Sequence, residues 1–227
     1  MENESALRMA RDLADRLKPA DLDATLSQVT EAAVRLLPNV QFSSITVLAP
    51  DGLRTVAPTD DRLVRVDESQ SRLQEGPCYT AASDDAPVLS SDLRSDQRFP
   101  RYGPLAVAEG IRSQAGLPLF DAARSRGALN VYSTRVGAFD DSATLSALFA
   151  HQAGQAIAYA QEITSLAEAV RTRTLIGEAV GLVMERFTLT DERAFAFLKR
   201  LSSHRNVKIR VLAQELVDEA NARGAGT

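Results

Sequence analysis

Five basic side chains and no acidic one lie within residues 198–210, whose sequence is LKRLSSHRNVKIR. Like charges on neighbouring helical turns repel by about a few tenths of a kcal/mol per pair, so solvated helix faces normally mix signs. An unmixed cluster is stabilised instead by a polyanion, because Lys and Arg displace its condensed counterions. Between the charges, Ser202, Ser203, His204 and Asn206 can contact bases or sugars. The stretch therefore predicts a surface for nucleic acid or another polyanion.

Charge is distributed unevenly along the 227-residue chain, whose formal net charge is −4. Residues 1–170 hold 16 Lys and Arg against 23 Asp and Glu, a net charge of −7. Residues 171–227 hold 10 basic and 7 acidic residues, a net charge of +3. This asymmetry indicates that the C-terminal end meets nucleic acid or another acidic partner.

Motifs that carry catalysis or metal binding are not found in the sequence. It contains no GxSxG nucleophile elbow, no phosphate-cradling GxxxxGK[ST], no HExxH and no GxGxxG. The two histidines, His151 and His204, lie 53 positions apart without an acidic or cysteine companion at ligand spacing. We therefore expect no catalytic residue and no metal site, and we expect the chain not to be an enzyme.

Cys78 is the single cysteine, so it can form no disulfide within the chain. A lone cysteine is usually a small buried hydrophobe, which is the role expected here. The alternative is redox sensing, which needs an exposed thiol with a lowered pKa. Together with Tyr79, Phe120 and Tyr132, Cys78 is a candidate lining for a small-molecule cavity. Core packing is the favoured explanation of these aromatic side chains.

Hydrophobic periodicity predicts the elements that must hold these residues. An amphipathic helix fills 1–20, and a second helix over 21–38 ends at Pro38. The following elements are a hairpin at 42–59 with its turn at Pro50-Asp51-Gly52, a polar helix at 61–76, a strand at 86–93, a loop with a short helical piece at 94–110, and a second hairpin formed by 111–121 and 126–134.

A single helical pattern begins at Asp141 and continues for more than forty residues without proline. Along it, apolar residues repeat at alternating spacings of four and three, the heptad pattern of a coiled coil. They are Phe149, Ala153, Ala156, Ala160, Ile163, Ala167 and Val170. The alternative is that the stripe packs on its own domain, as its first half must do in any case. A helix much longer than about 25 residues cannot bury its far half that way, so the pattern favours a homodimer through the 141–186 helix.

Three helices form the predicted C-terminal bundle: the end of the long helix, 190–203 and 207–222. Thr190 is the expected N-cap of the second helix, with two acidic residues in the first turn against the helix dipole. Asn206 is expected to cap the last helix. The predicted bundle core consists of Met184, Phe195, Leu198 and Leu212.

Residues 171–217 resemble an ANTAR domain, the RNA-binding module of transcription antitermination regulators. The matching residues are Arg173, Ile176, Ala179, Gly181, Met184, Glu192, Ala194, Phe195, Leu198, Arg200, Ser202, Asn206 and Ala213. Ser203 departs from the pattern, which has a bulkier residue there. The resemblance implies that the bundle binds paired RNA hairpins in the leader of a messenger RNA and favours an antiterminator over a terminator.

The resemblance also implies a set of RNA contacts. Ala179 and Gly181 would keep the helix surface low, so that RNA can approach closely. Basic side chains would meet phosphates or stacked loop bases, and polar ones would read base edges or 2′-hydroxyls. The expected RNA-binding residues are Arg173, Ala179, Gly181, Lys199, Arg200, Ser202, Ser203, His204, Arg205, Asn206, Lys208 and Arg210.

Residues 21–165 resemble a GAF domain in their order of helix, hairpin, excursion, hairpin and helix. Within them, 73–119 look like the actinobacterial GAF domains that are fused to ANTAR domains. This resemblance implies a sensor that takes a small-molecule or protein signal. The NKxFDE signature of cyclic-nucleotide binding is absent, and the GAF-type methionine sulfoxide reductases use several cysteines where this chain has one. The sequence identifies no cofactor and no ligand for the domain.

The sequence therefore predicts an α+β protein in which a GAF-like antiparallel sheet flanked by helices is joined by a long coiled-coil helix to a three-helix bundle. The predicted boundaries are 1–20 for an N-terminal helix, 21–165 for the GAF sensor, 141–170 for the coiled coil, 166–222 for the ANTAR bundle and 223–227 for a tail. Apolar runs fall short of the roughly 20 residues that span a bilayer, and the N-terminus has no leader pattern. We expect a cytoplasmic protein without a membrane partner.

Two alternatives stay open at this point. The first is a DNA-binding regulator, because a three-helix bundle with a basic turn also fits a helix-turn-helix reader. Against it, the turn at 202–206 lacks the tight glycine turn often seen in that motif. The second is a redox enzyme that uses the GAF cavity with Cys78.

Overall fold

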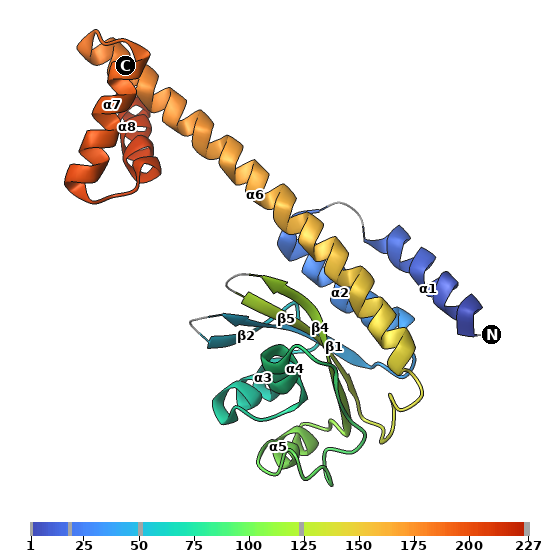
Figure 1. The fold of residues 1–227 in the computed structure, drawn as a ribbon. Helices are drawn as coiled ribbons and strands as arrows, with labels where there is room; N and C mark the ends of the chain where they lie inside the picture. The colour runs from blue at the N-terminus through green and yellow to red at the C-terminus, as the bar shows by residue number, and fades with distance from the viewer. Residues whose placement is uncertain (1, 18–19, 50–51, 123–124, 225–227) are drawn as a thin grey trace. The chain divides into compact units, whose positions relative to one another are not determined.

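The computed structural model describes residues 2–17, 20–49, 52–122 and 125–224. The elements are α1 (Glu2–Arg16), α2 (Leu22–Leu36), β1 (Phe42–Ala49), β2 (Gly52–Val56), α3 (Arg62–Leu73), α4 (Pro77–Asp84), β3 (Val88–Ser90), α5 (Tyr102–Ala108), β4 (Ser113–Ala122), β5 (Ser125–Ser133), α6 (Ala143–Phe187), α7 (Asp191–Arg205) and α8 (Ile209–Gly224). The chain divides into two compact units, Met1–Gln161 and Glu162–Thr227. We call them the N-terminal unit and the C-terminal unit; α6 belongs to both (Figure 1).

The N-terminal unit is built on a five-stranded antiparallel sheet with the strand order β2-β1-β5-β4-β3. Both predicted hairpins are present, as β1–β2 and β4–β5. The pairing of β1 with β5 joins them, with Ile45 opposite Leu129. Figure 1 shows α2 and the first part of α6 over one face of this sheet, and α3, α4 and α5 over the other. The expected turn residues 50–51 and 123–124 lie outside the described residues.

The two faces of the sheet differ in polarity because side chains alternate along each strand. On β1, Ile45 and Val47 point into an apolar core with α2 and α6. Ser44 and Thr46, which alternate with them, point to the other face and are fully buried there. β5 repeats the pattern, with Leu129 in the apolar core and Tyr132 on the opposite side. The face under α3, α4 and α5 therefore has a partly polar core.

The C-terminal unit is a three-helix arrangement of the end of α6 with α7 and α8. Its fully packed residues are small or branched, and they follow helical spacing on each element. They are Ala179, Val183, Ala194, Leu198, Leu212 and Ala213. This confirms the predicted α+β architecture with a C-terminal helical bundle.

Three local expectations are wrong. Pro77 begins a helix, α4, that was not expected between the helix at 61–76 and the strand at 86–93, and proline is well placed in a first helical turn. Asn206 ends α7 in the left-handed conformation, at φ 52°, and does not begin α8. Phe195 is 44% exposed instead of lying in the core, because the inward stripe of α7 passes through Ala194 and Leu198.

The predicted heptad stripe of α6 divides into two parts. Phe149, Ala153 and Ala160 are buried in the N-terminal unit. Further along, Ile163 and Val170 are exposed, as is Ala167. The first half of the stripe thus has its partner within the same chain, and the partner of the second half stays a prediction.

The predicted tail at 223–227 overlaps α8 at its first two residues, and its remaining residues lie outside the described chain. Among the helices that the structure describes, none combines the length and the apolar character needed to cross a membrane.

Candidate nucleic-acid interface and buried polar core

The turn between α7 and α8 is shaped by its own polar residues. The amide of Val207 donates to the carbonyl of Ser202 at 3.1 Å, and the Ser202 hydroxyl donates back to the Val207 carbonyl at 2.6 Å. Asn206 adopts the left-handed conformation that reverses the chain. Ser202 and Asn206, both predicted RNA contacts, therefore have a structural role in fixing this turn.

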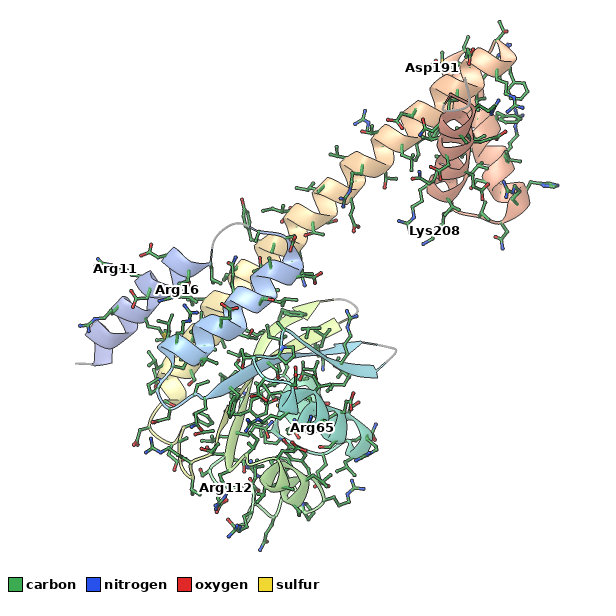
Figure 2. All side chains as sticks on the ribbon, turned by 180° about the vertical axis from the view of Figure 1, so that it is seen from behind. Arg11, Arg16, Arg65, Arg112, Asp191 and Lys208 are labelled. Carbon is green, nitrogen blue, oxygen red and sulfur yellow. The ribbon has the colours of Figure 1, made fainter. Side chains whose placement is uncertain are left out.

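Four basic side chains project from the helices on either side of this turn. Lys199, Arg200, Lys208 and Arg210 are all exposed, and within the described part of the chain none has an ion-pair partner. We call these four residues the basic surface. Figure 2 shows Lys208 at the end of the bundle opposite to Asp191. Because no carboxylate neutralises these charges, the surface can attract an anion.

The remaining residues of the turn are exposed but differ in their partners. Arg205 pairs with Glu215, Nη1 to Oε2, at 2.7 Å. A half-exposed pair of this kind contributes only about 0–1 kcal/mol, so a phosphate can compete for the guanidinium. The hydroxyl of Ser203 donates to the Lys199 carbonyl at 3.0 Å, and His204 is exposed.

The predicted contacts on α6 are only partly accessible. Ala179 is fully buried between the helices of the bundle, so its side chain cannot meet RNA, contrary to expectation. Its small size serves helix packing instead. Gly181 is exposed with open space where a side chain would stand, and so is Gly177, one turn earlier.

Arg173 lies in a groove between α6 and α7 that sequence reasoning did not predict. The groove measures about 550 Å³ and is also lined by Ile176 and Phe195. An exposed aromatic ring beside an arginine can stack an unpaired base. The spacing of Phe195 fitted a core position equally well, and only the packing of Ala194 and Leu198 distinguishes the two.

The polar core of the N-terminal unit centres on Asp67 of α3, which is completely buried. Its carboxylate accepts hydrogen bonds from the hydroxyls of Ser44 at 2.8 Å and Thr55 at 3.0 Å, from Gln70 Nε2 at 3.1 Å, and from Tyr132 Oη. Burial raises the pKa of Asp67 to about 6, and these four hydrogen bonds oppose the rise by stabilising the anion.

Cys78 and Tyr132 meet in this core, whereas the other two predicted cavity residues do not. Cys78 Sγ lies 3.6 Å from Tyr132 Oη and accepts a hydrogen bond from Gln114 Nε2 at 2.7 Å. Tyr79 is half-buried on α4. Phe120 packs against the apolar core on the opposite face of the sheet. The four residues therefore do not line one pocket.

The Cys78 thiol does not have the environment that redox chemistry requires. It is 1% exposed, and burial, together with the nearby Asp67, raises the pKa of the thiol far above its usual range. A reactive cysteine needs access and a lowered pKa. The structure thus favours the expected packing role and argues against the redox alternative.

Sequence reasoning missed Asp67 as a functional candidate. It lies in a polar helix, where a charged residue is normally solvated. One signal was available: Ser44 and Thr46 alternate with Ile45 and Val47 in the strand, which indicates a polar inner face.

Comparison with known families gives two matches that together cover most of the chain. The GAF domain family matches residues 19–158, and the ANTAR domain family matches residues 164–217. No curated protein sequence matches the chain.

Solved structures resemble the N-terminal unit. A GAF domain of an Acinetobacter phosphoenolpyruvate-protein phosphotransferase has a TM-score of 0.54 at 16% identity, over 70% of this chain and 97% of that chain. The free methionine-R-sulfoxide reductase of Neisseria meningitidis has a TM-score of 0.51 at 16% identity, over 71% and 90%. An N-acylhomoserine lactone-dependent LuxR-family factor from Burkholderia cenocepacia has a TM-score of 0.54 at 15% identity, over 67% and 94%. At these identities the likeness shows the fold alone.

Proposed function

Because the chain belongs to the GAF–ANTAR regulators, we propose that its C-terminal unit binds RNA hairpins in nascent transcripts and thereby favours antitermination. At family level this is a sensor-regulated transcription antitermination regulator, and the domain combination is that of a regulator rather than an enzyme. The observation that carries the finer proposal is the basic surface, whose four charges have no acidic partner in the described chain.

The kinds of side chain that the C-terminal unit exposes favour RNA hairpins over other polyanions. Paired RNA is recognised mainly through its backbone, whereas loop bases can splay out and stack on aromatic or guanidinium groups. Lys199, Arg200, Lys208 and Arg210 would contact phosphates. His204, Ser203 and the groove with Arg173 and Phe195 offer polar and aromatic groups for loop bases.

A direct test compares three probes: a paired-hairpin RNA, a single-stranded RNA of the same composition, and duplex DNA. We expect the full chain to bind the hairpin at least about tenfold more tightly than the other two at physiological salt, because loop and backbone contacts add. Fluorescence anisotropy measures all three affinities. Preference for duplex DNA would establish the DNA-binding alternative, and equal weak binding would reduce the surface to a general polyanion patch.

We also propose that α6 forms a homodimer. Tyr159, Ile163, Leu166 and Val170 are spaced 4-3-4, and three of the four are at least 60% exposed. Such a stripe in water favours burial against an identical stripe of a second copy. A dimer would present two bundles to two hairpins, which raises overall affinity through effective concentration. Through the same helix, the GAF domain would bias RNA binding on receiving its signal.

Placing charges in this stripe should separate the dimer. We expect Leu166→Glu/Val170→Glu to be monomeric at concentrations where the wild type is dimeric, because four like charges would face each other across the seam. Analytical ultracentrifugation measures the mass. The control, Ser165→Glu/Ala169→Glu, carries the same charge about 100° round the helix, at two exposed positions. Identical sedimentation of all three proteins would contradict this interface.

A further inference from the structure

Asp67 links α3 to three strands of the sheet through hydrogen bonds from neutral donors. Its four donors come from β1 (Ser44), β2 (Thr55), β5 (Tyr132) and its own helix (Gln70). No arginine, lysine or histidine contacts the carboxyl among the residues that the structure describes. A buried anion held by neutral donors alone is costly to desolvate, and uptake of a proton removes that cost.

The titratable neighbours of Asp67 do not change their charge near neutral pH. They are Cys78 on α4, Tyr102 on α5 and Tyr132 on β5. Burial raises the pKa of each of the three, so all of them stay neutral around pH 7. β1 and β2 present Ser44 and Thr55, which do not titrate. Asp67 is thus the group of this core whose charge can change near neutral pH.

The hydroxyls around Asp67 can accommodate either charge state. Ser44 Oγ and Tyr132 Oη lie 3.1 Å apart, and either one can donate to the other. The same holds for Tyr132 Oη and Cys78 Sγ at 3.6 Å. If the carboxyl gains a proton, it can donate to Ser44, which then donates to Tyr132, which then donates to Cys78. Ser44 and Tyr132 can thus reorient their hydroxyl hydrogens and keep hydrogen-bond partners in both charge states.

We propose that the GAF domain is a proton-responsive sensor in which Asp67 takes up one proton from solvent as the pH falls below neutral. Protonation replaces an anion that holds four donors with a neutral group that accepts fewer and donates one. The attachment of α3 to the sheet changes accordingly. The input of this domain is then the proton itself, received inside the core.

The raised pKa of Asp67 determines how its contribution to the stability of the fold depends on pH. Burial raises the pKa of Asp67 from 3.8 to about 6 in the folded chain, so the folded state binds this proton more tightly than the unfolded state does. The contribution of Asp67 to stability is therefore complete below about pH 3.8 and is lost as the pH rises through about 6. This sign is opposite to that of a carboxylate in an ion pair, such as Asp92 with Arg112.

The test is a carbon-13 NMR titration of the full chain labelled at aspartate carboxyls, with Asp67 assigned through the backbone. We expect the Asp67 carboxyl to titrate between about pH 5 and 7, well above an ordinary aspartate. This resonance should vanish in Asp67→Asn and stay in the control Asp61→Asn, an exposed carboxyl just before α3. A wild-type Asp67 that titrates below about pH 4.5 overturns the proposal, and this result needs no variant to fold.

A second arm, which rests on the proposed function, measures hairpin affinity from pH 5.5 to 8. We expect a pH-dependent change of about threefold or more in the wild type that is absent in Asp67→Asn, because effects of the RNA or of the bundle are common to both proteins. The same pH dependence in both proteins overturns the coupling to RNA. Absence of hairpin binding at every pH overturns the proposed function, while the carboxyl titration still decides the proton site.

Discussion

Replacing Lys199, Arg200, Lys208 and Arg210 with alanine should weaken hairpin binding by roughly 100-fold or more at physiological salt. Each of these side chains is exposed and without an ion-pair partner in the described chain, so its removal costs the fold little. Each phosphate contact that is lost also leaves a counterion condensed on the RNA, which removes the entropy gained by its release. Fluorescence anisotropy with a fixed hairpin measures the change.

The matched control removes four arginines from exposed positions of the N-terminal unit. Arg11 and Arg16 lie on α1, where Figure 2 labels them, with Arg35 on α2 and Arg72 on α3. The quadruple alanine variant at these positions has the same net charge as the first one. We expect its hairpin affinity to stay within about threefold of the wild type. Equal losses in the two variants would mean that net charge, and not the basic surface, determines binding.

Gly154→Ala should destabilise the N-terminal unit by about 2–3 kcal/mol. A β-carbon at this position of α6 would stand 2.2 Å from the carbonyl oxygen of Leu119, far inside van der Waals contact with a backbone atom that cannot rotate away. The helix must move off β4 or the strand must bend. Urea unfolding followed by circular dichroism measures the loss, with the transition of the N-terminal unit treated separately.

Gly177→Ala is the control on the same helix. No atom lies within 4 Å of the position that its β-carbon would take, so alanine adds helix propensity without a clash. Gly177 lies in the C-terminal unit, and we expect the substitution to stabilise that unit by about 0.5–1 kcal/mol. If both substitutions change the free energy of unfolding alike, close packing of α6 on β4 is not the reason for Gly154.

Much of the fold could be predicted because local and global signals agree. Alternation in β1 places Ile45 and Val47 on one face, and Pro50-Asp51-Gly52 marks the turn of the first hairpin. The C-terminal bundle follows from helical periodicity. The prediction failed where the local sequence is ambiguous. The pair Gly76-Pro77 fits a break as well as the first turn of a helix, and only tertiary packing selects α4.

Of the two candidate sites, the basic surface could be predicted from the sequence and the buried polar core could not. The exposed charges of the basic surface follow from composition, because a run without acidic residues is visible in the sequence. Asp67 could not be found in this way, since its partners Ser44 and Tyr132 lie 23 and 65 positions away. Likewise Ala179, chosen as an RNA contact, is buried by residues of two other helices, and its exposure depends on packing that no local pattern reports.

We propose that the basic surface binds the phosphates of an RNA hairpin, and the salt dependence of binding is the sharpest test of this contact. The slope of log affinity against log salt counts the phosphate contacts, at roughly 0.7–0.9 for each. We expect the variant that lacks Lys199, Arg200, Lys208 and Arg210 to have a slope shallower than that of the wild type by about 3. An unchanged slope would contradict it, because the four side chains would then contact no phosphate.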